Sequence, residues 1–345
     1  MHMTDAQSPA VELQRWRDSL ANATRFYPST DFHFDRVLKL VDDWFLKTQK
    51  HLELFRRGMD VTRDTVEIGV LDARDIEANA NPHLDTERNG VSSFVQVSLG
   101  IAPKALGLAN RAHVARLFGA HDPMVADVFE NWSIHDNTAG MLMLGAGHVD
   151  QATFNSVHDV MSLTLFHEIA HGLELFPQPT REQQQELKAF EACADEGSGF
   201  LFVCALLHEQ RAQGKKDIDA IIDRLADASF FLSALLYWMS PASKDYHHPW
   251  TRMRCFMRGA CLALHPKDRS RWNEVAERAW NRNVEYGMAF SLFTDEQLWF
   301  WKDEAVVAAD WDNFTNVSMP LMKKMRASLT RDSILTPVTE WMNEV

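Results

Sequence analysis

Cysteine is scarce in this 345-residue chain, which contains four, and no two of them form a close CxxC pair. Zinc knuckles and dithiol redox sites need such pairs, and small secreted domains need many cysteines for their disulfides. The sequence therefore excludes both kinds of site, and we expect four reduced thiols in a cytoplasmic protein. The cysteines are Cys193, Cys204, Cys255 and Cys261.

Long hydrophobic runs are also missing. The two longest, residues 199–207 and 230–239, fall short of the about 20 residues that a membrane-spanning helix needs. Residues 1–16 are polar and lack the apolar segment of a secretory signal. We therefore expect a soluble protein with no membrane partner.

Positive charge is in the minority. The chain has 35 Lys and Arg residues against 48 Asp and Glu, a formal net charge of −13, and no dense basic run occurs in it. A nucleic-acid surface needs clustered positive charge. We therefore expect no nucleic-acid partner.

Apolar residues make up 46% of the chain, which is enough for a sizeable core. Their spacing of three and four predicts helices within residues 10–58 and through most of the chain after residue 150. Alternation predicts strands at 65–72 and 93–101, which we expect to be antiparallel neighbours. The expected fold class is α+β, predominantly helical, with a small antiparallel or mixed sheet. We expect an N-terminal helical segment at 1–60, a core at 61–265 and a C-terminal helical extension at 266–345 packed on that core.

One apolar helical stretch is interrupted by His167, Glu168 and His171. Helical residues four apart lie on one face, so the two imidazoles can reach one metal ion. Glu168 is turned about 100° from His167, where its carboxylate can accept a proton from a water on that ion. Chance would produce the triplet in roughly a few per cent of chains this rich in histidine. A zinc site therefore needs a third ligand from elsewhere in the sequence.

The identity of the third ligand distinguishes one kind of HExxH zinc site from another. The metzincin pattern requires glycine and histidine three and six residues after His171, where this chain has Glu174 and Pro177, so it is excluded. Further on, Glu191 can complete a two-His, one-Glu zinc site, and Asp195, one helical turn later, can accept a hydrogen bond from a ligand histidine. The alternative is that Glu191 and Asp195 are solvated acids on a helix surface.

A polar cluster lies at residues 245–254, where Pro249 favours a turn. Attack of water on a carbonyl creates an oxyanion that needs a hydrogen-bond donor. We expect His248, with Arg254 or Tyr246, to polarise that carbonyl. The alternative is an ordinary polar start to a helix. The cluster contains Tyr246, His247, His248, Arg252 and Arg254.

These motifs resemble those of the gluzincin metallopeptidases, which include HtpX and the CAAX prenyl proteases, and of the phage-exclusion Lit peptidases. HEIAH is similar to their HExxH, EACAD at 191–195 to their ExxAD, and HPWTRMR at 248–254 to their HPxxxxR element. The resemblance covers residues 65–254 and implies zincin-like active-site helices. It implies Glu191 as third ligand, Asp195 as its supporting partner, and His248 as a substrate- or oxyanion-binding group supported by Arg254.

A fourth, weaker match is IEANA at 76–80, which is similar to the INAxA segment of these enzymes but has Glu77 for Asn and Asn79 for an aromatic residue. In such enzymes the strand that follows aligns an extended substrate through main-chain hydrogen bonds. This implies that residues 93–99 form an exposed edge above the zinc. A strand buried within a mixed sheet is the alternative.

The sequence as a whole predicts a soluble zinc endopeptidase that cuts an intracellular protein, with Zn²⁺ as cofactor and Glu168 as general base. Two other functions fit parts of the sequence. Glu168 to His171 also spells the ExxH half-site of a di-iron bundle, but no second ExxH occurs in the chain. A metal-stabilised scaffold that binds proteins without cutting them has no need of a base at Glu168.

Overall fold

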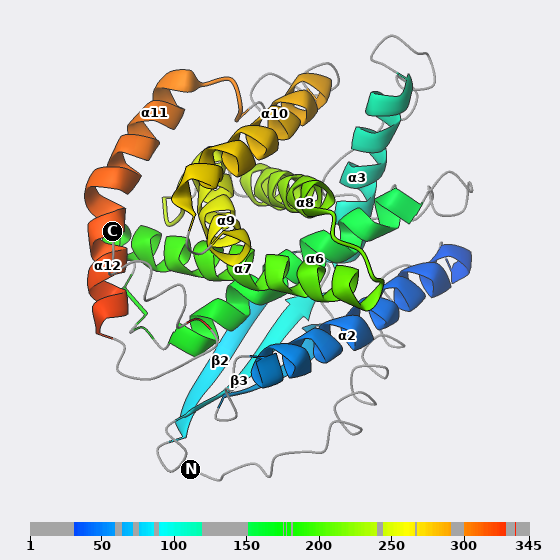
Figure 1. Ribbon diagram of the computed structural model, residues 1–345, viewed down its shortest axis with the longest axis horizontal. Coiled ribbons are helices and arrows are strands. Elements are labelled where there is room, and N and C mark those ends of the chain that lie inside the picture. Colours follow the sequence, from blue (N-terminus) through cyan, green and yellow to red (C-terminus); the bar gives the residue numbers. More distant parts are fainter. Residues whose placement is uncertain are drawn as a thin grey trace.

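The structure is a computed structural model, and its helices and strands are shown in Figure 1. The structure describes residues 31–58, 64–71, 76–85, 90–118, 151–174, 176, 178–180, 182–239, 244–265, 268–290, 300–328 and 335.

A three-stranded mixed sheet is built from β1 (Thr65–Leu71), β2 (Ala78–Asp85) and β3 (Gly90–Ser98), in the order β1-β3-β2. β3 is parallel to β1 and antiparallel to β2. The expectation that 65–72 and 93–101 are antiparallel neighbours is therefore wrong. The chain returns through β2 before it enters β3, so β3 runs in the direction of β1.

β3 is the central strand of this sheet, which corrects the expectation of an exposed edge at 93–99. Ile68 faces Val95 on one side, and Ala80 faces Val95 on the other. Most of β3 is buried accordingly. The outer strands in the described part of the sheet are β1 and β2, and β2 contains Pro82, a residue that edge strands tolerate because it has no N–H to donate.

Helices make up most of the described chain, and the predicted class of predominantly helical α+β is confirmed. Figure 1 shows the sheet on one side of α6 and α7, with α8, α9 and α10 on the other. The helices are α2 (Asp31–Gly58), α3 (Ile101–Phe118), α6 (Gln151–Glu174), α7 (Gln184–Ala212), α8 (Ile218–Met239), α9 (Pro249–Leu264), η2 (Arg269–Arg271), α10 (Trp272–Phe290), α11 (Glu304–Asn313), the π-helix η4 (Phe314–Ser318) and α12 (Met319–Ala327).

The centre of the molecule is α7, in which every residue from 192 to 203 is buried. A helix covered on all sides must satisfy its polar side chains within the protein. Ser198 Oγ donates to the carbonyl of Leu163 on α6 at 2.7 Å. Asp195 and Glu196 are paired with arginines. The polar residues of this stretch therefore tie α7 to its neighbours.

Small residues allow the helices around α7 to approach closely. A Cβ at Gly197 would lie 2.8 Å from the Cβ of Ala170, so α6 and α7 meet there. A Cβ at Gly199 would overlap the carbonyl oxygen of Phe256, and one at Gly259 would overlap the carbonyl oxygen of Glu196. The α7–α9 contact therefore brings backbone against backbone.

The last described helix is fastened to both α6 and α7 by one buried side chain. Arg326 of α12 donates to Glu174 Oε1 at 3.0 Å, to Glu196 Oε2 at 2.6 Å and to the carbonyl of Cys193 at 2.9 Å. At the other end of the chain, Trp44 Nε1 of α2 donates to Ser162 Oγ at 2.9 Å. Helices on both sides of the predicted core thus pack on it, while the boundaries at residues 60 and 265 stay predictions.

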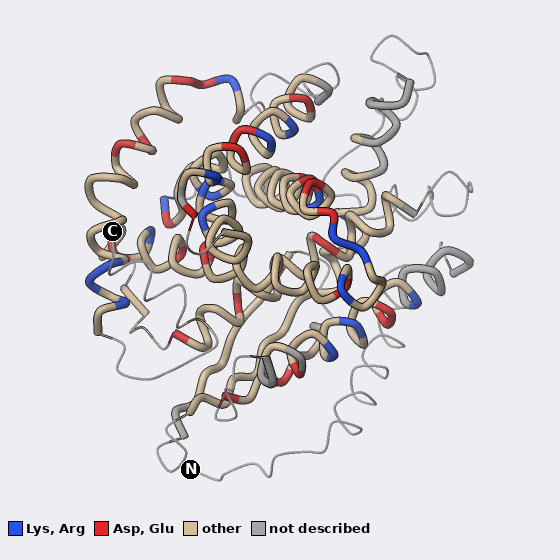
Figure 2. The backbone as a smooth tube through the Cα atoms, viewed as in Figure 1, with Lys and Arg blue, Asp and Glu red and all other residues tan. Residues whose placement is uncertain are grey.

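Three surface and chemical properties complete the fold. None of the helices in the described stretches is long and apolar enough to span a membrane. The four cysteines are free thiols, as predicted. Figure 2 shows acidic and basic residues scattered together over the described helices.

We expect Gly199→Ala to lower the free energy of unfolding by about 3 kcal/mol, because a methyl group there meets the backbone of α9 rather than a mobile side chain. Urea denaturation followed by circular dichroism measures the change. Gly214→Ala is the control. Gly214 has φ +67° with open space around it, so alanine there costs only backbone strain, about 1 kcal/mol. Equal losses in the two variants would contradict the close α7–α9 contact.

Candidate metal centre

The polar triplet of α6 lies within an otherwise apolar helix. Val157, Val160, Met161, Leu163 and other apolar residues bury α6 in the core. The helix continues through the triplet and ends at Glu174, and Pro177 lies outside the described residues. The core thus holds the backbone of both histidines rigidly.

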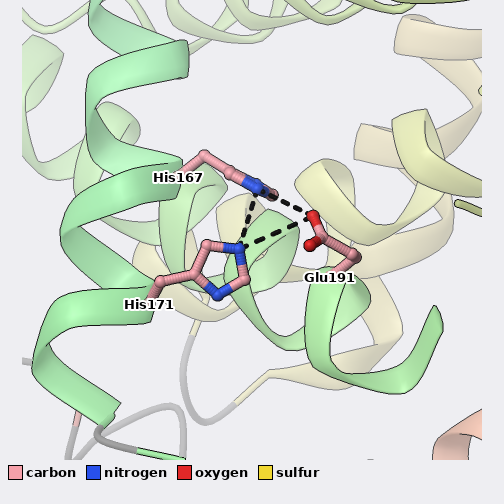
Figure 3. Close-up of side chains that lie close together, drawn as sticks. All are labelled: His167, His171 and Glu191. Carbon is pink, nitrogen blue, oxygen red and sulfur yellow. Dashed lines mark hydrogen bonds and ion pairs between the residues drawn. The ribbon is translucent and has the colours of Figure 1, made fainter. Parts of the chain in front are cut away.

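Three side chains converge on one point, as Figure 3 shows. His167 Nε2 lies 3.1 Å from His171 Nε2 and 3.1 Å from Glu191 Oε2, and the third side of the triangle, His171 Nε2 to Glu191 Oε2, measures 3.5 Å. Ligand atoms 2.0–2.1 Å from one tetrahedral ion lie about 3.3 Å apart. The triangle has the size that a zinc ion requires. Among the described residues, these three form a group that could hold a metal ion.

Phe190 fixes the plane of the second histidine. Its ring stacks on the imidazole of His171, with centroids 4.2 Å apart and an interplanar angle of 20°. The two imidazoles themselves meet edge to face at 4.6 Å. Phe190 was missed by the sequence analysis, although its position directly before Glu191 is a signal that it belongs to the same turn of α7.

Asp195 lies behind His167, where the sequence placed it. Its Oδ1 is 2.9 Å from His167 Nδ1, and its side chain is almost fully buried. Arg252 of α9 binds the same carboxylate with two hydrogen bonds, Nε to Oδ2 and Nη2 to Oδ1, both of 2.8 Å. When His167 is neutral, a proton on Nδ1 facing Asp195 leaves the lone pair of Nε2 directed at Glu191. Two electron-rich atoms then face each other, an arrangement that a proton or a metal cation between them would stabilise.

The pKa shifts of His167, Glu191 and Asp195 all arise from neighbouring groups of opposite charge. Burial alone lowers the pKa of His167, but its contacts with Asp195 and Glu191 outweigh burial and raise the pKa to about 10. Burial raises the pKa of Glu191, yet His171 and His167 hold it below its usual range. Burial also raises the pKa of Asp195, but Arg252 outweighs burial and lowers it. Each group is stabilised in its charged form by a neighbour of opposite charge.

Glu168 stands beside this cluster, partly buried at the next position of α6. Burial raises the pKa of its carboxyl group, and the nearby His167 and His171 oppose that rise. With neutral imidazoles, the carboxylates of Glu168, Glu191 and Asp195 face the guanidinium of Arg252. Two negative charges are left over, which a divalent cation would balance.

Besides Arg252, Tyr246 is a member of the 245–254 cluster that lies near this site. Its ring lies under the guanidinium of Arg252, 5.0 Å from centroid to Cζ, and the residue is 42% exposed. The negative charge of Glu191, followed by burial, raises the pKa of Tyr246 to about 12. Its hydroxyl is therefore protonated at neutral pH and can donate a hydrogen bond.

His248 and Arg254 take other positions among the described residues. His248 is the N-cap of α9, where its Nδ1 accepts from Trp250 N at 3.3 Å, and its ring faces Phe300. Arg254 lies over the rings of Trp280 and Trp311. Neither has a described contact with the triangle. The arginine that does support it is Arg252, which the sequence analysis named in the cluster without assigning it a role.

Comparisons with protein-family models, with curated proteins and with solved structures give no significant match for this chain. The resemblance to gluzincin peptidases therefore rests on the sequence motifs alone. The geometry of His167, His171, Glu191 and Asp195 stands independently of that resemblance, because it follows from how α6, α7 and α9 pack.

We expect protein purified without chelator to contain about one zinc ion per chain and His171→Ala to lose it. Asp195→Asn should weaken zinc binding by about 10–100-fold, because it replaces the negatively charged carboxylate that accepts from His167 with a neutral amide. Inductively coupled plasma mass spectrometry and competition with a zinc-binding dye measure both effects. His83→Ala, which changes an exposed histidine of β2, is the control and should keep its zinc. Equal zinc content in all variants would exclude this centre.

Proposed function

We propose that this protein is a zinc-dependent endopeptidase. The observation that carries the proposal is the triangle of His167 Nε2, His171 Nε2 and Glu191 Oε2, which stands beside a partly buried carboxylate, Glu168, on the same helix. Two histidines and one glutamate are the ligand set of catalytic zinc sites that keep a fourth position open for water. A purely structural zinc site is usually closed by four protein ligands.

Each residue of the site has a separate role in the proposed hydrolysis of a peptide bond. His167, His171 and Glu191 would hold a zinc ion, which supplies a Lewis acid that activates water and polarises a carbonyl. Glu168 accepts the proton of the attacking water and delivers it to the leaving amine. Tyr246 donates a hydrogen bond to the oxyanion that forms on the carbonyl. Asp195, held by Arg252, keeps His167 in the tautomer and orientation that a ligand needs.

The sheet supports a peptide as the substrate. Gly172, next to His171, is packed so closely on the sheet that a Cβ there would meet Ser93 of β3 and lie 3.7 Å from the Cβ of Ala80 on β2. Within the described sheet, β2 is the outer strand on this side, and its Asn79 and Asn81 are exposed. An extended peptide can pair with the outer edge of such a strand through main-chain hydrogen bonds. β2 therefore replaces residues 93–99 as the proposed substrate-aligning strand.

The proposed setting is the cytoplasm, and the proposed substrate is an intracellular protein. Four free thiols and the absence of a membrane-spanning helix from the described residues support this setting. A non-catalytic scaffold would need the three zinc ligands but would not need a glutamate at position 168. The role of Glu168 thus distinguishes the two functions.

We expect Glu168→Gln to keep the zinc and to lower peptide hydrolysis by about 10²–10⁴-fold, because an amide cannot accept the proton of water. Incubation of the wild type and the variant with a cytosolic extract, followed by mass spectrometry of new amino termini, gives the cleavage sites. Glu186→Gln, on the first turn of α7, is the matched control and should cleave as the wild type does. Identical cleavage by Glu168→Gln would contradict the proposal, and a zinc-loaded wild type that cuts nothing would favour the scaffold.

Tyr246→Phe should keep the zinc and lower kcat by about 10²-fold with little change in KM, since the hydroxyl acts on the oxyanion rather than on the bound peptide. Steady-state kinetics on a peptide taken from an identified cleavage site measures both constants. Tyr237→Phe is the control, because Tyr237 contacts Phe300 away from the triangle. A rise in KM alone in Tyr246→Phe would mean that Tyr246 only binds substrate.

A further inference from the structure

Two adjoining cavities lie where α9, α10 and α11 meet, on the side of α9 away from α7. Figure 1 shows these three helices together at the upper left. The cavities measure about 430 Å³ and about 560 Å³. Both volumes fall within the range of sites that bind small molecules. Both cavities are lined by Trp250, Arg254, Trp280 and Trp311.

Their walls are apolar and aromatic. The rings of Trp250 and Trp280 lie 4.6 Å apart, and Trp280 is 37% exposed, so an aromatic surface is open to solvent at this point. Met253 and Met257 extend the first cavity, and Trp301 lines the second. Tryptophan and methionine present polarisable surfaces that suit a hydrocarbon or aromatic guest.

One charged group stands where the two cavities join. The guanidinium of Arg254 lies 4.3 Å from the ring centroid of Trp311 and 5.3 Å from that of Trp280. These stacking contacts orient the guanidinium but do not use its N–H donors. Within the residues that the structure describes, Arg254 contacts no carboxylate. By contrast, the other arginines with well-covered side chains each contact one: Arg224, Arg252, Arg258, Arg282 and Arg326.

The surroundings of Arg254 favour an anion at this junction. Burial lowers the pKa of Arg254, and no carboxylate among its described neighbours offsets the effect. Arg258, in the first cavity, is already engaged by Glu196. Glu277 and Glu304 line the cavities but are exposed, as is Lys302. The buried part of the junction therefore carries a positive charge next to apolar walls.

We propose that these cavities bind a small apolar carboxylate, whose carboxylate pairs with Arg254 and whose hydrocarbon or aromatic body lies against Trp250, Trp280 and Trp311. A planar guanidinium matches a carboxylate with two parallel hydrogen bonds. The site is separate from the metal triangle. Arg252 and Arg254 are two residues apart on α9, so they point about 200° apart around the helix, one to Asp195 and one to the cavities.

Isothermal titration calorimetry with 4-phenylbutyrate, and with its neutral counterpart 4-phenylbutanamide, tests this site. We expect the wild type to bind the acid more tightly than the amide. Arg254→Met should weaken binding of the acid by about 10–100-fold and leave binding of the amide unchanged, because only the charge-assisted hydrogen bonds are lost. The affinity of Arg254→Lys for the acid should lie between those of the wild type and Arg254→Met. Lysine keeps the positive charge but cannot form the two parallel hydrogen bonds of a guanidinium.

Two control variants locate the position at which the acid binds. Arg278→Met, which removes a more exposed arginine of α10, should bind the acid as the wild type does. His171→Ala should also bind it normally, whereas loss of binding there would place the acid on the metal and overturn the proposal. Equal affinity of the wild type for acid and amide, no binding of the acid, or undiminished binding by a folded Arg254→Met would each overturn it. Circular dichroism and thermal unfolding establish that each variant is folded.

Discussion

The close approach of α6 and α7 is the constraint on which the candidate metal centre depends. The ligands come from both helices, and a triangle with sides of 3.1 to 3.5 Å tolerates little movement between them. Gly197 against Ala170 sets the separation of the helices. Arg326 then fastens Glu174 on α6 to Glu196 on α7 from outside the pair. α12 thus contributes to the geometry of the centre from a position beside α6 and α7.

The distribution of buried charge points to the same place. Buried carboxylates are unfavourable unless each has a cation or several donors. Asp195 has Arg252, and Glu196 has Arg258 and Arg326, whereas Glu191 and the neighbouring Glu168 lie against the two histidines. A proton on His167 compensates part of this charge, and a divalent cation would compensate it fully. The surplus of negative charge lies at the point on which the three ligand atoms converge.

Local spacing made the candidate ligands recognisable in the sequence. His167 and His171 share a helix face by their separation alone, and Glu191 and Asp195 share one on the next helix, whereas the meeting of these two faces depends on the packing of α6 on α7. The sheet was harder, because strand order is a long-range property. β2 contains Asn79, Asn81 and Pro82, residue types that favour turns over strands, so the sequence predicted no strand there. Without β2, β3 could not be recognised as the central strand.

Arg254 shows a second limit of sequence reasoning. The motif at 248–254 places His248 and Arg254 together in the sequence, but it does not say which side of α9 faces the candidate metal centre. The structure turns Arg252 to Asp195 and turns Arg254 to Trp280 and Trp311. A buried aspartate needs a cationic partner, and the sequence offers more than one arginine on α9 as the partner of Asp195. Only the packing of α7 on α9 shows that this partner is Arg252. The same packing created the aromatic cavities, which no sequence pattern predicted.

X-ray absorption spectroscopy at the zinc edge reports the ligand atoms of a bound zinc ion without requiring a substrate. We predict a zinc ion with nitrogen and oxygen neighbours at about 2.0–2.1 Å and the multiple-scattering signature of two imidazoles. Thiolate neighbours at about 2.3 Å, a single imidazole, or protein that takes up no zinc would contradict it.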